Sequence, residues 1–131
     1  LGVLGLNFGM QGMQFTATST TAENQTLSFP MYVHSISNNN DNQDIVSMGC
    51  NAALITRKVI DNCFDVLYIQ AMALMQAIDQ LQCHSRLSSH TLNVYQAIRA
   101  LVEPIVEDKP RYKDIQVVRK YLTRIGSEIN L

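Results

Sequence analysis

The chain carries little charge and no excess of either sign. Of its 131 residues, 16% are charged and 7% are aromatic, and the formal net charge is −1. Nucleic acids and anionic membranes attract proteins through clustered basic residues. The balance of charge therefore argues against both as partners.

Cysteine is scarce and widely spaced. Cys50, Cys63 and Cys83 are an odd number of thiols, whereas small disulfide-stapled domains carry dense, paired cysteines. The pattern predicts reduced thiols in a cytoplasmic protein. A metal site is also disfavoured, because the spacing of Cys83, His84 and His90 matches no standard zinc motif.

Positive charge is missing from the start of the chain, where the first charged residue is Glu23. A signal peptide would need a basic segment there, and a membrane span would need about 20 mostly apolar residues. Asn7, Gln11 and the hydroxyl-rich run 16–21 interrupt the apolar pattern. Because the chain opens on Leu1 inside that pattern, we expect residues 1–131 to form one helical domain that is a piece of a larger protein.

Apolar periodicity predicts an all-α, long-helix bundle with helices at about 1–27, 44–82, 89–106 and 113–126. In the first of these, Gly2, Gly5, Gly9 and Gly12 fall on one helical face. Glycine weakens a helix by about 1 kcal/mol per residue, so close approach of another helix would have to compensate. The alternative is that these glycines mark a loop and that the helix begins near Phe8.

The predicted helix at 44–82 is apolar on nearly all sides between Val66 and Ile78. Such a helix is normally buried all round, and 131 residues can hardly surround it. We therefore expect further chain or partner subunits to pack against it.

An amide-rich segment, residues 38–44 with the sequence NNNDNQD, precedes this helix. It is either a solvated loop or a ligand site, because Asn and Gln side chains both donate and accept hydrogen bonds. Asn42 or Asp44 would cap the helix, whose positive end would favour an anion. His34 is a weaker candidate, as a general base beside the loop, and is expected to be a surface histidine.

Several short motifs resemble the C-terminal third of the histidine, tyrosine and phenylalanine ammonia-lyases and the related aminomutases. They are GLNFG at 5–9, AEN at 22–24, DNQDIVSMG at 41–49, AIRALV at 97–102 and DKP at 108–110. The NQDxxSMG signature is fairly specific, and the similarity covers nearly the whole chain.

The resemblance implies a cytoplasmic homotetramer whose central helices are shared among subunits. It implies removal of ammonia from an L-amino acid through a methylidene-imidazolone (MIO) ring formed from Ala-Ser-Gly. This chain contains no Ala-Ser-Gly. We therefore expect no catalytic residue here, no metal and no activity from these 131 residues alone.

The resemblance also implies which residues bind substrate. Asn42 and Gln43 match the family's substrate-contacting pair, and Asn39 matches a polar position three residues earlier. Histidine-specific members are similar but have Glu where this chain has Gln43, and a neutral amide suits phenol or phenyl better than imidazole. The substrate is thus predicted to be Tyr or Phe rather than His, with an aromatic aminomutase or a non-catalytic helical interaction module as the alternatives.

Overall fold

A computed structural model describes residues 2–3, 5–34, 36–37, 39–42 and 47–128, with the side chains of 126–128 excepted. No strand occurs in this part of the chain, and the architecture is all-α, as the sequence predicts. The elements are α1 (Gln11–Leu27), η1 (Met31–His34), α2 (Gly49–Leu81), η2 (His84–Arg86), α3 (Ser89–Arg99) and α4 (Tyr112–Glu128).

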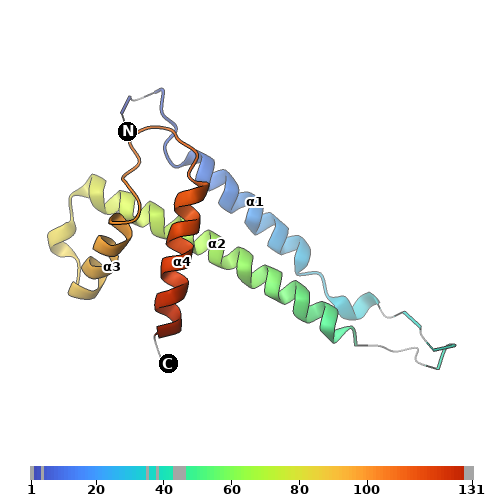
Figure 1. Ribbon diagram of the computed structural model, residues 1–131. Coiled ribbons are helices and arrows are strands. Elements are labelled where there is room, and N and C mark those ends of the chain that lie inside the picture. Colours follow the sequence, from blue (N-terminus) through green and yellow to red (C-terminus); the bar gives the residue numbers. More distant parts are fainter. Residues whose placement is uncertain (1, 4, 35, 38, 43–46, 129–131) are drawn as a thin grey trace.

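The 33-residue helix α2 is the element against which the others pack (Figure 1). Helix α1 runs alongside its first half, α3 folds back beside its end, and α4 crosses its middle. The connection between α1 and α2 lies at the far tip of this hairpin, away from both chain ends. None of the described helices is long and apolar enough to cross a membrane.

The hydrophobic core lies where the second half of α2 meets α1, α4 and the segment after α3. Its buried members are Met13, Tyr68, Ile69, Met72, Met75, Ile98, Val102, Ile105 and Val118. On α4, Val118 is completely buried and its neighbours at helical spacing, Ile115 and Leu122, pack against the core. This is the inward face that the 3.6-residue periodicity predicts for the fourth helix.

The first helix begins at Gln11, so the expectation of a helix from residue 1 is wrong; Gly5 and Gly9 lie in a loop, as the alternative predicts, whereas Gly12 lies in the first turn of the helix. Gly5 and Gly9 have φ of +85° and +63°, a region that glycine enters without the clash of a Cβ. Asn7 folds this loop locally, because its Oδ1 accepts a hydrogen bond from the Val3 amide at 2.9 Å. The glycine spacing reflects turns rather than a helix–helix contact.

The other helix ends also differ from the predicted ones. Helix α2 begins at Gly49 rather than near 44, because Met48 adopts a left-handed φ of 50° and, like Ser47, is not helical. It follows that Asn42 is not its cap, and Asp44 lies outside the described residues. Helix α3 ends at Arg99 rather than near 106, since Pro104 has no amide hydrogen and restricts Glu103. Helix α4 spans 112–128 instead of about 113–126.

Side-chain hydrogen bonds fasten the segment after α3 onto α2. The Gln76 amide pairs with the backbone of Ile105 twice: Nε2 donates to its carbonyl at 3.1 Å, and Oε1 accepts from its N–H at 2.8 Å. Near the end of α2, Asp79 accepts a hydrogen bond from the Tyr95 hydroxyl and pairs with Arg99 at 2.5 Å. The bond to Asp79 raises the pKa of Tyr95 above its usual value.

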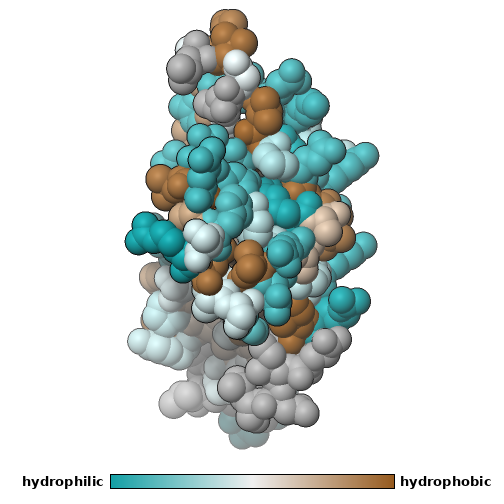
Figure 2. All heavy atoms as spheres, turned by 90° about the vertical axis from the view of Figure 1, so that its left-hand side faces the viewer, coloured by the Kyte–Doolittle hydropathy of each residue, from teal (hydrophilic) through white to brown (hydrophobic). Residues whose placement is uncertain are grey.

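One apolar row of α2 stays open to solvent within this chain. Ile60, Phe64, Leu67 and Leu74 are each about half exposed, at 50%, 46%, 52% and 54%. Apolar side chains also reach the surface among polar ones at the α3 end of the molecule (Figure 2). These 131 residues therefore do not surround α2 by themselves, and its cover by further chain or partner subunits stays a prediction.

Two adjacent valines on α4 give a direct test of the core. Val118→Ala removes two methyl groups from a fully buried site and should lower the free energy of unfolding by about 2 kcal/mol. Val117→Ala removes the same atoms from a side chain that is 38% exposed, and should cost less than about 0.5 kcal/mol. Equal losses in urea unfolding would contradict this placement of the core.

Candidate functional site

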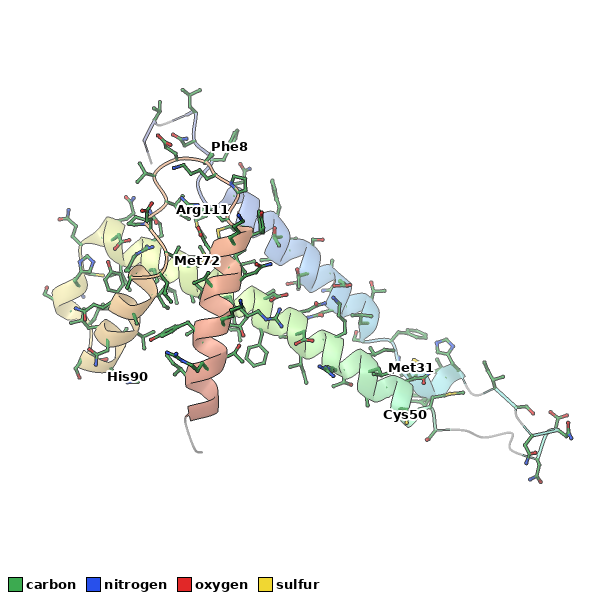
Figure 3. All side chains as sticks on the ribbon, viewed as in Figure 1. Phe8, Met31, Cys50, Met72, His90 and Arg111 are labelled. Carbon is green, nitrogen blue, oxygen red and sulfur yellow. The ribbon has the colours of Figure 1, made fainter. Side chains whose placement is uncertain are left out.

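The candidate site is the connection between α1 and α2, at the tip of their hairpin. Helix α1 ends at Leu27, Pro30 follows, and η1 (Met31–His34) forms one short turn before the amide-rich segment. Met31 and Cys50 lie close to the base of this connection (Figure 3). The two helices therefore present the loop between them as an exposed tip.

Left-handed backbone shapes the described part of the amide-rich loop. Asn39, Asn40 and Asp41 have φ of 55°, 51° and 62°, and Asn and Asp tolerate this region better than other side chains. The backbone N–H of Asn42 donates to the backbone carbonyl of Asn39 at 3.1 Å, and Ser37 Oγ donates a hydrogen bond to the Asp41 carboxylate. The sequence thus makes a tight polar turn here because its residues can adopt this backbone.

Two of the three predicted substrate-binding residues fall in this turn. Asn39 and Asn42 are both exposed and are joined through their backbones. Each amide side chain offers donors and an acceptor without adding charge, which suits hydrogen bonding to a carboxylate or an amino group. Gln43 lies outside the described residues, so its position stays a prediction.

The weaker candidates have ordinary structural environments. His34 is exposed, as expected of a surface histidine, with its ring 5.7 Å from that of Phe29. His84 Nε2 hydrogen-bonds to the Tyr95 hydroxyl at 2.8 Å. Among the residues that the structure describes, no group of three or more His, Cys, Asp or Glu side chains could hold a metal ion.

A polar cluster between α1 and α2, in which Asn62 is buried and Glu23 is half exposed, is the feature that sequence reasoning missed. Asn62 is 3% exposed, and its Nδ2 donates to Glu23 Oε2 at 2.7 Å and to Asn24 Oδ1 at 2.9 Å. The available signal was its position, since Asn62 sits at helical spacing between Val59 and Val66 on the inner face of α2. We call Glu23, Asn24 and Asn62 the polar clamp.

A cavity of about 640 Å³ lies at the opposite end of α1, where the first loop meets the segment before α4. Its lining includes Phe8, Phe15 and Asp108. The Asp108 carboxylate closes this junction, because it accepts the amide hydrogens of Phe8 at 2.8 Å and Gly9 at 2.9 Å. Both bonds favour the ionised carboxylate and lower the pKa of Asp108.

Comparison with known proteins adds sequence and structural relatives. A family model described as aromatic amino acid lyase matches residues 2–100. A histidine ammonia-lyase of Macrococcus caseolyticus is 38% identical over 120 residues, which are 92% of this chain and 24% of that protein. An MIO-dependent tyrosine 2,3-aminomutase of Streptomyces globisporus is 37% identical over 120 residues, or 92% and 22%.

Solved structures show the same similarity. The tyrosine aminomutase from Streptomyces globisporus superposes with a TM-score of 0.87 at 34% identity, over 99% of this chain and 26% of that one. The histidine ammonia-lyase from Trypanosoma cruzi gives a TM-score of 0.82 at 31% identity, over 94% and 24%. The chain thus spans about a quarter of the length of the relatives it matches.

Acid should release the junction at Asp108. Since its folded pKa is lowered, the two amide hydrogen bonds are complete above the ordinary aspartate pKa of about 3.9 and are lost as pH falls through the lower folded value. The amide resonances of Phe8 and Gly9 should report this titration together by NMR. In Asp108→Asn the titration should vanish; if it persists there, another group is responsible.

Proposed function

The chain belongs to the aromatic amino acid lyase family, and we propose that it is the C-terminal part of an enzyme that removes ammonia from an L-amino acid to give an α,β-unsaturated acid. The match of the family model over residues 2–100 carries this proposal. The full enzyme would be a carbon–nitrogen lyase, and the product would be urocanate, coumarate or cinnamate according to substrate.

Within that enzyme, this chain would supply one wall of the substrate pocket. Asn42 would hydrogen-bond near the substrate carboxylate, with Asn39 beside it and Gln43 near the amino group or the cofactor. The turn that joins Asn39 to Asn42 supports these roles, since it places two exposed Asn residues together at the tip of the hairpin.

The cofactor must be built from residues outside this sequence. A methylidene-imidazolone ring supplies the electrophile in such enzymes, and its Ala-Ser-Gly precursor does not occur here. The residues present therefore do not fit as a source of the ring, and they include no proposed catalytic group. Their part is to bind and orient the substrate, so we expect the 131 residues alone to be inactive.

The identity of Gln43 favours an uncharged aromatic ring. A glutamate at this position can pair with an imidazole, which is cationic or donates an N–H. A neutral glutamine removes that charge-assisted bond and suits the phenol or phenyl ring of Tyr or Phe. We propose Tyr or Phe as substrate ahead of His.

Two alternative functions of the full protein are also considered. The similarity to a tyrosine aminomutase over nearly the whole chain favours a 2,3-aminomutase as the second candidate, in which the amino group returns to the neighbouring carbon. A non-catalytic helical interaction module is the third, because a helical scaffold can persist without its chemistry.

We propose that the full enzyme is a cytoplasmic homotetramer, and the open apolar row of α2 supports its assembly from several subunits. Ile60, Phe64, Leu67 and Leu74 form a continuous stripe on a helix that lies in the core of the fold, and exposed stripes of this kind mark interaction surfaces. Their occupants would be helices of the longer chain and of its copies.

The substrate assignment can be tested in the full-length enzyme by exchanging Gln43 for Glu. The added carboxylate should raise the ratio of kcat/KM for His over Tyr by about tenfold, measured from the ultraviolet absorbance of the conjugated acids. Gln116→Glu, the same change at an exposed position of α4, should leave the ratio unaltered. Urocanate as sole product of the unmodified enzyme would overturn the assignment to Tyr or Phe.

Assembly can be tested by placing a charge in the open apolar row. Leu67→Glu should dissociate the tetramer into smaller species, because a carboxylate buried without a partner opposes association. Light scattering after size exclusion measures the mass directly. Asn93→Glu, at an exposed site on α3, serves as control, and an intact tetramer in Leu67→Glu would remove this helix face from the interface.

A further inference from the structure

We propose that Asn62 is a positioning residue: through the polar clamp it fixes the register of α1 against α2 and so places the loop that carries Asn39 and Asn42. The inference rests on the proposed function for its catalytic consequence, although the register itself is independent of activity. Asn62 hydrogen-bonds to α1 and acts on the loop through the two helices that hold it.

The clamp is a set of hydrogen bonds across the α1–α2 interface, and its half-exposed Glu23 also pairs with Lys58 at 3.9 Å. Both amide hydrogens of Asn62 are used, one by Glu23 at 2.7 Å and one by Asn24 at 2.9 Å. Asn24 in turn points its own Nδ2 at the Val59 carbonyl at 3.5 Å. Because an ionised carboxylate only accepts hydrogen bonds, Glu23 also fixes which end of the Asn62 amide faces it.

Apolar packing on α1 gives little definition to the register. The inner face of this helix follows a stripe of alternating spacing, Met13, Ala17, Thr20, Asn24 and Leu27, and only Met13 is fully buried. Its middle is small or polar, so several registers would pack almost equally well. A buried polar residue discriminates among them, as a single core Asn does in coiled coils.

A slip by one helical turn would bring Asn62 opposite Thr20 or Leu27. Neither offers the two acceptors that Glu23 and Asn24 provide together. The buried Asn62 amide would then keep an unpaired donor, and this cost is what the native register avoids.

The clamp is also the buried contact nearest the loop. None of residues 49–61 of α2 is buried, and Asn62 is the first that is. Between the clamp and the loop lies a cavity of about 300 Å³, lined by residues that include Leu27, Met31 and Ile55. Apolar side chains on that side, such as Ile55 and Val59, are only half-buried, so their packing defines the register less tightly than the core does.

A slip of one residue would move the loop along the hairpin by about 1.5 Å. Hydrogen-bonding groups in a binding site need to be held within about 0.5 Å. The shift caused by a slip of one residue therefore exceeds this tolerance, and the register decides whether the loop amides reach a ligand.

Asn62→Leu in the full-length enzyme separates positioning from stability. Leucine has a similar volume, and the two partners that it leaves, Glu23 and Asn24, are not buried, so the midpoint of thermal unfolding should change little. The loop would lose its defined register, and KM for the amino acid should increase about tenfold while kcat changes less than threefold. Asn93→Leu, at an exposed position of α3, should alter neither constant.

A polarity exchange supplies the rescue. Asn62→Asp sets two carboxylates against each other and should raise KM, whereas Glu23→Gln/Asn62→Asp restores one donor and one acceptor and should return KM to within about threefold of the unmodified enzyme. Glu23→Gln alone keeps an acceptor for Asn62 and should behave as the unmodified enzyme. Unchanged KM in Asn62→Leu, or no rescue in the double variant, would overturn the proposal.

Hydrogen exchange keeps this test separate from the proposed function. Amides of α1 should exchange faster in Asn62→Asp and recover in the double variant, while α4 stays unchanged. If the full-length protein turns over no amino acid, the proposed function fails but the exchange still decides on the clamp. Identical exchange of α1 in all variants would overturn the clamp even in an active enzyme.

Discussion

The structure depends on one constraint: α2 is apolar around most of its circumference, and this chain covers only part of it. Helices α1 and α4 and the segment held by Gln76 bury Tyr68, Met72 and Met75, while the row through Leu67 stays half exposed. Burial of apolar surface is the main driving force of folding, which is why we propose that further chain or partner subunits cover this row. The chain also spans only about a quarter of the length of its relatives, in which other segments are present that could pack against such a helix.

Periodicity predicted the parts of the fold where side chains alone decide the structure. The all-α class and the inward face of α4, with Val118 at its centre, follow from apolar spacing. It failed where the backbone decides. Gly5 and Gly9 have the spacing of residues on one helical face but adopt positive φ. Met48 also adopts positive φ, so α2 begins only after it, and a Met side chain gives no sign of this backbone conformation.

The candidate site likewise has a part that the sequence predicts and a part that it does not. A run of Asn and Asp is visible in any composition count, and the tight turn from Asn39 to Asn42 follows from their tolerance of left-handed backbone. The role of Asn62 could not be predicted in the same way, since a single amide in an apolar stripe does not by itself indicate a polar contact. Its meaning depends on Glu23 and Asn24, 39 and 38 residues away in sequence, and only the packing of α1 on α2 brings them together.

These two features answer different demands on the same loop. The proposed binding of substrate at the tip calls for neutral amides that can both donate and accept, which favours a polar and weakly packed segment. Such a segment cannot hold its own position to the accuracy that binding needs. The order must therefore come from the helices beneath it. On the part of α1 that follows Met13, the inner face is otherwise Ala17, Thr20 and Leu27, so hydrogen bonds define the register there better than shape does. A polar residue buried between the supporting helices can in this way hold an exposed polar loop in place.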